Sequence, residues 1–421
     1  MKLLVIAFVL ATLLVSATPV VSSSYAVSSS SHASFSTTPA VNPMNIRNRT
    51  LTSPNVQSDG YFGYSISVSG ELVAVGAAGE TADGYSYAGH GYVYNLATGR
   101  LVSILTSPNA QTQGVFGLSI SISGKLVTVG APSETADGYQ YAGHSYIFNA
   151  NTGKLIETLT SPNAQYDGEF GNSVAMSGEL VTVGAPRETA NGYSGAGHAY
   201  VFNSMSGKLI EVLTSPNAQD DGYFGYSVFV TGKLVTVGAP QETADGNYQA
   251  GHAYLFNSGT GKLIANLTSP NAQIEGFFGL SVSASGKLVT VGAPQETADG
   301  YAQAGHAYVF NANTGKLIET LTSPNAESAG GFGFSVSMSG KLNAVGAPTE
   351  TADGYQGAGN VYVFNSATGK LVSTVTSPNA QTNGVFGASI SMSEKLLTIG
   401  APEETAHGYT YAGHAHIFYG V

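Results

Sequence analysis

The sequence has no cysteine and few charged residues, and both absences narrow the classes of protein to consider. Without cysteine the chain has neither disulfide bonds nor a thiol that could accept a lipid. Charged residues make up 10% of the chain, and the formal net charge is −11. Because binding to a phosphate backbone requires a basic surface, we expect no nucleic-acid partner. After the first residues, no apolar run is long enough to span a bilayer.

The first residues predict export. Lys2 precedes the apolar run Leu3 to Val15, which leads into the small-residue sequence Val15-Ser16-Ala17. This pattern is typical of a secretory signal peptide, which we place at residues 1–17. We therefore predict a secreted or cell-surface protein that has no membrane-spanning segment after cleavage. The alternative is an uncleaved membrane anchor. Residues 18–44 are rich in serine and predict a flexible linker.

A 54-residue repeat fills the chain from about Leu51 onward. A period of this length is typical of solenoids, propellers and arrays. An open solenoid needs polar caps at both ends, and neither end of this chain has that character, so the repeat favours a closed ring. The seven copies follow one another without insertion or deletion, and their Gly-Ala-Pro steps begin at Gly76, Gly130, Gly184, Gly238, Gly292, Gly346 and Gly400.

Each repeat contains four candidate strands separated by Gly, Pro and Asn. In the fifth copy they are Leu280–Ala284, Lys287–Val291, His306–Asn311 and Lys316–Thr322. β-branched and aromatic residues fill these segments, and helix signals are absent. We therefore predict an all-β fold, a seven-bladed β-propeller of four-stranded antiparallel blades.

The two ends of the chain complement each other. The last copy stops at Tyr419-Gly420-Val421, after its third strand, whereas Asn45 to Thr52 aligns with the missing fourth strand. We predict that this N-terminal strand completes the last blade and closes the ring. Residues 45–421 would then form one propeller domain.

The repeat resembles the FG-GAP repeat. In the fifth copy Phe278-Gly279 precedes Gly292-Ala293-Pro294, and a glycine and an Ala-Tyr-Val-Phe strand follow. All seven copies keep Phe-Gly, and six keep Gly-Ala-Pro, the exception being Gly76-Ala77-Ala78. The FG-GAP repeat builds the seven-bladed propeller at the head of integrin α subunits and of related prokaryotic surface proteins. The resemblance implies an extracellular binding domain.

The connections divide between two faces of the predicted disc. Short Ser-Gly-Lys and Thr-Gly-Lys turns carry the lysines to one face, and long loops with the motif Glu-Thr-Ala-Asp-Gly-Tyr lie on the other. We expect the long-loop face to be acidic and exposed, and we place any ligand there. The candidate ligand-face residues are Glu134, Asp137, Tyr139, Glu188, Tyr193, Glu242, Asp245, Glu296, Asp299, Tyr301, Glu350, Asp353 and Tyr355.

The same loop also has a structural interpretation. Its Glu, Thr and Asp would fold the loop onto itself, and the following His would cap the next strand or pack between blades. Sevenfold repetition favours this interpretation over seven equal cation or sugar sites. Because His becomes Asn360, and Asp becomes Asn191 and His407, no single metal geometry holds in all copies, and we predict no metal site and no cofactor.

The resemblance to integrin α implies calcium binding. In that family acidic residues between the first two strands of a blade bind calcium, but here that connection is Ser123-Gly124-Lys125 or a near variant. It is too short, and too poor in carboxylates, to supply six to eight oxygens. Weak calcium binding by the acidic loops of the opposite face stays open.

Two functions compete at this point. The first is an exported or cell-surface, non-catalytic binding propeller that recognises a protein or glycan through its long-loop face. The second is an extracellular glycosidase or lyase that uses loop carboxylates such as Glu403-Glu404 or Asp220-Asp221. No nucleophile elbow, P-loop or zinc-protease motif supports an enzyme. The sequons at Asn48 and Asn266 are candidate glycosylation sites on predicted outer strands.

Overall fold

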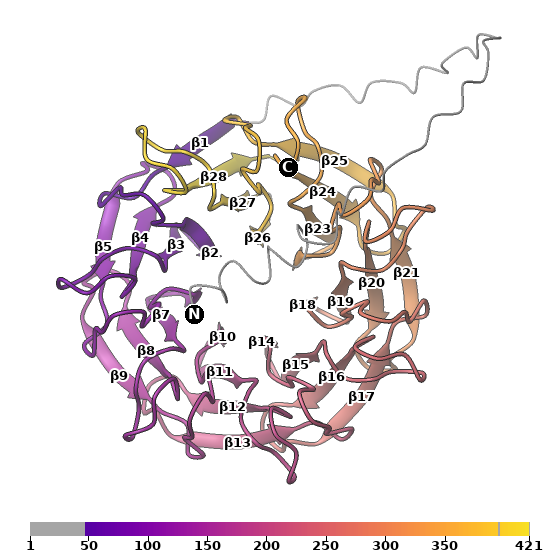
Figure 1. The fold of residues 1–421 in the computed structure, drawn as a ribbon, viewed down its shortest axis with the longest axis horizontal. Coiled ribbons are helices and arrows are strands. Elements are labelled where there is room, and N and C mark those ends of the chain that lie inside the picture. The colour runs from indigo at the N-terminus through magenta and orange to yellow at the C-terminus, as the bar shows by residue number, and fades with distance from the viewer. Residues whose placement is uncertain (1–46, 395, 421) are drawn as a thin grey trace, which may run out of the picture.

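The computed structural model describes residues 47–394 and 396–420, which form seven four-stranded antiparallel sheets arranged in a ring (Figure 1). The predicted seven-bladed β-propeller is confirmed. The signal peptide and linker predicted at residues 1–17 and 18–44 lie outside the described residues. Within those residues, no helix is long and apolar enough to cross a membrane.

The strands of each blade run from the axis outward in chain order. The innermost strands are β2 (Phe62–Ser69), β6 (Ser119–Ser123), β10 (Ser173–Ser177), β14 (Ser227–Thr231), β18 (Ser281–Ser285), β22 (Ser335–Ser339) and β26 (Ser389–Ser393). The second strands are β3 (Leu72–Ala77), β7 (Leu126–Ala131), β11 (Leu180–Ala185), β15 (Leu234–Ala239), β19 (Leu288–Ala293), β23 (Leu342–Ala347) and β27 (Leu396–Ala401).

The outer half of each blade follows the same order. The third strands are β4 (His90–Asn95), β8 (His144–Asn149), β12 (His198–Asn203), β16 (His252–Asn257), β20 (His306–Asn311), β24 (Asn360–Asn365) and β28 (His414–Tyr419). The outermost strands of blades 1 to 6 are β5 (Leu101–Leu105), β9 (Leu155–Leu159), β13 (Leu209–Thr214), β17 (Leu263–Thr268), β21 (Leu317–Leu321) and β25 (Leu371–Thr376). β1 (Arg47–Leu51) takes that place in blade 7.

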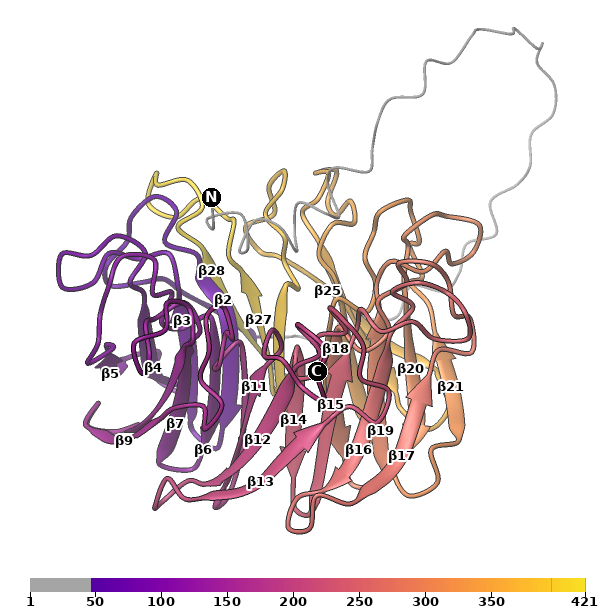
Figure 2. The same ribbon diagram turned by 60° about the horizontal axis from the view of Figure 1, so that its bottom comes forward.

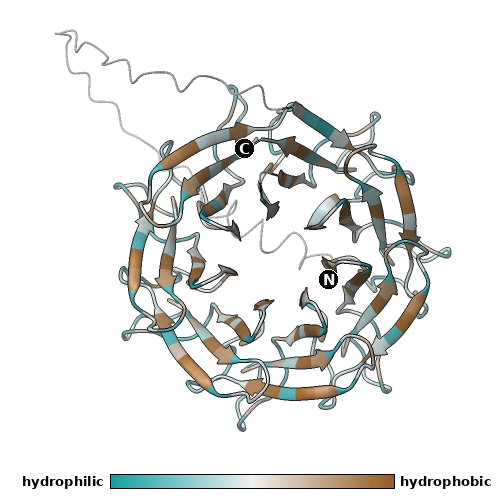
Figure 3. Cartoon of the chain, turned by 180° about the vertical axis from the view of Figure 1, so that it is seen from behind, coloured by the Kyte–Doolittle hydropathy of each residue, from teal (hydrophilic) through white to brown (hydrophobic). Residues whose placement is uncertain are grey.

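The hydrophobic core lies between adjacent blades. The second and third strands are buried along most of their length, because each blade packs on a neighbour on both sides. One cluster joins Val93 of blade 1 to Phe116, Val127 and Tyr146 of blade 2, and all four side chains are at most 1% exposed. The outer strands are half-exposed and mix apolar with polar residues (Figure 3).

The Phe-Gly and Gly-Ala-Pro steps join neighbouring blades. A Cβ atom on Gly130 would lie 1.9 Å from the carbonyl oxygen of Gly171 in the next blade, so only glycine permits this approach. Ser119 donates a hydrogen bond to the same oxygen over 2.8 Å. All seven blade junctions have the equivalent serine bond, including that from Ser389 to Gly63, which joins the last blade to the first over 2.7 Å.

The N-terminal strand closes the ring, as the sequence predicts. β1 pairs with β28 in antiparallel register from Arg47 opposite Tyr419 to Leu51 opposite Ala415. Leu51 is 5% exposed and packs in a cluster that spans blades 7 and 1. Figure 2 shows β28 and β27 beside the first blade, so the beginning and end of the described chain lie together. β1, with the sequence RNRTL, is the most hydrophilic outer strand (Figure 3).

Candidate functional site

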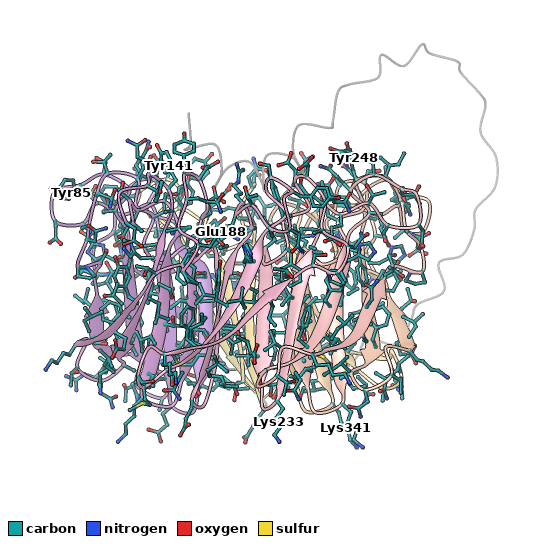
Figure 4. The ribbon with its side chains drawn as sticks, turned by 90° about the horizontal axis from the view of Figure 1, so that it is seen from below. Tyr85, Tyr141, Glu188, Lys233, Tyr248 and Lys341 are labelled. Atoms are coloured by element: carbon teal, nitrogen blue, oxygen red, sulfur yellow. The ribbon has the colours of Figure 1, made fainter. Side chains whose placement is uncertain are left out.

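The two faces of the ring differ as expected. Tyr85, Tyr141 and Tyr248 lie at one edge of the side view, and Lys233 and Lys341 lie at the other (Figure 4). The long loops after the second and fourth strands form the edge with the tyrosines, which we call the long-loop face. The turn face carries the short turns and every lysine of the described residues. Among residues 47–394 and 396–420, Arg187 is the one lysine or arginine in a long loop.

The tip of each Glu-Thr-Ala-Asp-Gly-Tyr loop is a tight hairpin. In blade 2, Ala136 and Tyr139 exchange both backbone hydrogen bonds, over 3.1 and 2.9 Å. The two residues between them, Asp137 and Gly138, have φ angles of 49° and 83°. Asp, Asn and His adopt this left-handed conformation more readily than other residues with a Cβ atom. The requirement explains why Asn191 and His407 replace Asp in two blades.

This hairpin exposes an aspartate and a tyrosine together. The aspartates predicted at the ligand face, Asp137, Asp245, Asp299 and Asp353, are all exposed. The tyrosine side chains are between 45% and 49% exposed at Tyr85, Tyr139, Tyr193, Tyr301, Tyr355 and Tyr409. In blade 4 Asn247 takes the tyrosine position, and the next residue, Tyr248, is 59% exposed. The long-loop face therefore carries a tyrosine in every blade.

The glutamates of the same loops are not exposed, and the expectation that they furnish the acidic surface is wrong. They turn inward because the hairpin fixes the tip of the loop while a set of buried donors surrounds each carboxylate at its base. The glutamates with 0% exposure include the predicted ligand-face residues Glu134, Glu188, Glu242, Glu296 and Glu350, together with Glu80 and Glu404. The structural interpretation of this position is confirmed.

Blade 2 illustrates the buried network. The Glu134 carboxylate accepts hydrogen bonds from the Ser107 hydroxyl and, over 2.5 Å, from the Tyr146 hydroxyl. Nδ1 of His144 lies 2.9 Å from Oε2 of Glu134. Ser107 belongs to the loop that enters the blade, whereas Tyr146 and His144 belong to β8. One carboxylate thus joins two long loops to a strand and gives the exposed hairpin a rigid base.

The networks of blades 6 and 7 depart from this pattern in opposite directions. In blade 6, Asn360 replaces His and donates to Glu350 over 2.9 Å. Burial raises the pKa of Glu350 to about 7. In blade 7, His416 replaces the tyrosine, so that two imidazoles face Glu404. Burial alone would raise the pKa of Glu404, but the contacts with His414 and His416 outweigh burial and lower it to about 2.

A second departure from the repeat is Arg187, in the long loop after β11 of blade 3. Nη1 of Arg187 lies 3.1 Å from Oδ2 of Asp167, and its Nε lies 3.3 Å from Oε2 of Glu169. The guanidinium carbon is 5.3 Å from the centre of the Tyr223 ring. In blade 7 the position of Arg187 is taken by Glu403, whose pKa burial raises to about 7.

The structure does not bring the other repeat departures into this cluster. Asn360 is buried within blade 6, His407 lies exposed at a hairpin tip, and Phe229 is half-buried on β14 against blade 5. The partners of Arg187 cannot be read from the sequence, because Asp167, Glu169 and Tyr223 belong to two other loops. The one available signal was that Arg187 is the single lysine or arginine in the long loops.

The carboxylate pairs considered for an enzyme have other contacts. Glu404 is tied to its two histidines, and Asp220 accepts a hydrogen bond from the backbone nitrogen of Ser194 over 2.8 Å. The connections between first and second strands, where the resemblance to integrin α implies calcium, have two residues each, such as Gly124-Lys125. With at most one carboxylate each, these connections have too few side-chain oxygens for the six to eight ligands of calcium. Asn48 and Asn266 are exposed on the outer strands β1 and β17.

Comparison with known families agrees with this architecture. The FG-GAP repeat matches four segments of the chain, at residues 47–94, 155–202, 262–310 and 317–364. Each match begins on the outermost strand of one blade, or one residue before it, and ends on the third strand of the next blade. The chain contains FG-GAP repeats and folds as a seven-bladed propeller. The fold of this FG-GAP propeller is consistent with the N-terminal propeller of integrin α subunits. A search of curated proteins found no match.

Proposed function

We propose that this FG-GAP propeller is an exported or cell-surface binding protein that recognises an extracellular protein or glycan through its long-loop face. The observation that carries the proposal is the ring of half-exposed tyrosines, each beside a loop tip and above a buried carboxylate network. A tyrosine offers a large contact area and a polar hydroxyl at a low cost in conformational entropy. The rigid base keeps the ring arranged for binding before a ligand arrives.

Charge supports the same face. Apart from Arg187, which is held by Asp167 and Glu169, the described long loops carry no lysine or arginine, and their exposed tips carry Asp83, Asp137, Asp245, Asp299 and Asp353. A basic protein, or a neutral glycan that stacks on tyrosine, suits this surface better than an acidic ligand. Repetition around the ring provides several equivalent contact points, which favours a ligand with repeating units.

An array of extracellular proteins and glycans, probed with the purified propeller, tests the proposal. The matched variants should differ only in the face that they alter. One replaces Tyr85, Tyr139, Tyr193, Tyr301, Tyr355 and Tyr409 with Asn, the residue found at this position in blade 4. The control replaces Lys233, Lys287 and Lys341 of the turn face with Gln. We expect the tyrosine variant to lose the wild-type array signals and the lysine variant to keep them; the reverse result would overturn the proposal.

A further inference from the structure

Blade 7 differs chemically from its six counterparts at the base of the long loop. In blades 1 to 6 the second residue after the His or Asn position is a tyrosine, whose hydroxyl donates to the buried glutamate. In blade 7 that residue is His416. Its Nε2 lies 3.1 Å from Oε2 of Glu404, and Nδ1 of His414 lies 2.8 Å from the same oxygen.

This substitution creates a set of three metal-ligand atoms. One atom from each of Glu404, His414 and His416 can be chosen so that all three lie within 4.8 Å of one another. Three donors at about 2.0–2.2 Å from a shared zinc ion lie within about 4 Å of one another, so small side-chain movements bring this set into range. In residues 47–394 and 396–420, this is the one group of three or more such side chains.

The surroundings of the cluster are those of a metal site. Glu404 and His416 are fully buried, and the His414 side chain retains 10% exposure. The other ring nitrogen of His416 lies 3.0 Å from the Thr50 hydroxyl, and the Ser377 hydroxyl donates to the second carboxylate oxygen of Glu404. Partners of this kind fix the orientation of a ligating imidazole or carboxylate. Thr50 lies on β1, so the cluster is in contact with the strand that closes the ring.

We propose that Glu404, His414 and His416 bind one divalent transition-metal ion, for which Zn²⁺ is the natural probe. Two imidazole nitrogens and one carboxylate oxygen suit Zn²⁺, whereas Ca²⁺ and Mg²⁺ require more oxygen ligands. Zn²⁺ binds imidazole nitrogens that carry no proton, so a proton on a ligating nitrogen is released to solvent when the ion binds. A bound ion would also join the loop after β27 to β28 and, through Thr50, to β1.

The experiment compares the metal-stripped full-length chain with two variants. His416→Tyr restores the residue found in the six other blades and removes one metal ligand while keeping a donor to Glu404. His306→Asn changes the equivalent of His414 in blade 5 into the residue that blade 6 has at that position. In blade 5 the buried glutamate faces one histidine rather than two, so this variant controls for the loss of a buried imidazole outside the proposed metal site. The readouts are Zn²⁺ stoichiometry by titration calorimetry and the melting temperature with added Zn²⁺, Ca²⁺ or Mg²⁺.

We expect wild type and His306→Asn to bind one Zn²⁺ per chain and to melt at higher temperature as Zn²⁺ is added. His416→Tyr should lose this site and the increase in melting temperature, and Ca²⁺ and Mg²⁺ should have no such effect on any of the three proteins. The proposal is overturned if the wild type binds no Zn²⁺, or if His416→Tyr binds it with the wild-type stoichiometry and affinity.

Discussion

The buried glutamate of blade 6 offers a quantitative test of the network that supports the long loops. Glu350 has no histidine partner, since Asn360 stands in its place and donates over 2.9 Å, and the Tyr362 hydroxyl donates over 2.5 Å. Burial raises the pKa of Glu350 from 4.5 to about 7. The folded protein therefore keeps a proton on Glu350 over a pH range in which the unfolded chain has released it.

The sign and size of the effect follow from this difference. Between pH 4.5 and 7 the folded state binds more protons than the unfolded state, so the contribution of Glu350 to stability falls as pH rises. The pKa of Glu350 differs by about 2.5 between the folded and the unfolded state, which corresponds to about 3 kcal/mol in the free energy of unfolding. The unfolding entropy is about 2.1 cal/mol/K per residue, so a change of about 0.8 kcal/mol in the free energy of unfolding shifts the melting temperature of the propeller by one degree. The expected change in melting temperature is therefore about 4 °C.

The variant Glu350→Gln removes the titrating group and keeps the shape of the side chain. We expect its melting temperature, relative to the wild type, to rise by about 4 °C between pH 4.5 and pH 8, as followed by circular dichroism or calorimetry. All other carboxyl groups are common to both proteins, so the difference isolates Glu350. A difference that does not change with pH would refute the assignment of a protonated Glu350 to the folded state.

Glu296→Gln in blade 5 is the matched control. Glu296 faces His306 at 2.9 Å and accepts from the hydroxyls of Ser269 and Tyr308. Replacing it removes the carboxylate that accepts from these two buried hydroxyls, and a buried donor left without an acceptor costs about 1–3 kcal/mol. We expect Glu296→Gln to destabilise the propeller at neutral pH by more than Glu350→Gln does. Destabilisation of equal size by both variants would show that the histidine does not distinguish the two blades.

Three further changes test the architecture by thermal melting. Deleting residues 45–52 removes β1 and its five paired positions on β28, and we expect the loss of Leu51 burial and of the closing strand to cost at least about 5 kcal/mol, or about 6 °C; an unchanged melting temperature would exclude ring closure by this strand. Gly292→Ala places a Cβ atom 1.9 Å from Gly333 O and should destabilise by about 3 kcal/mol or more, whereas Gly259→Ala, with its nearest neighbour at 3.8 Å, should be neutral within about 0.5 kcal/mol. Equal effects of the two alanines would contradict the role of the Gly-Ala-Pro glycine. Arg187→Gln, which gives the residue found in blades 4 and 5, should lower stability by about 1–3 kcal/mol because Glu169 is largely buried, and a neutral effect would show that the ion pairs contribute nothing.

The fold could be predicted from the sequence because repetition multiplies a weak signal. A single five-residue strand such as β18 is ambiguous, but its equivalents recur with the same Gly and Pro boundaries in every blade. The missing fourth strand after Tyr419 pointed directly to β1, since a ring with one incomplete blade leaves one edge unpaired. The strand pattern within each repeat and the completion of the last blade by β1 therefore predict the same closed ring.

The site was harder to predict because the sequence does not show which side of a loop faces inward. Asp137 and Tyr139 belong to a long polar loop, for which the sequence predicts exposure, and both are exposed. Glu134 is a charged residue three positions earlier in the same polar loop, and its burial depends on Ser107, His144 and Tyr146, which come from a preceding loop and the following strand. Such a network becomes visible only when the blade is assembled. The sequence shows His416 at the position of the tyrosine of the other copies, but its contact with Glu404 depends on the folded blade.

The most direct test of the binding face uses the absence of cysteine, because a single introduced thiol is then a unique probe. Thr297→Cys places the thiol on the long-loop face of blade 5, and Lys287→Cys places it on the turn face of the same blade; both positions are exposed. The measurement is the rate of maleimide labelling with and without a ligand found on the array. We expect the ligand to slow labelling of the Thr297→Cys variant and to leave the Lys287→Cys variant unchanged. Protection of the Lys287→Cys variant alone would contradict recognition through the long-loop face.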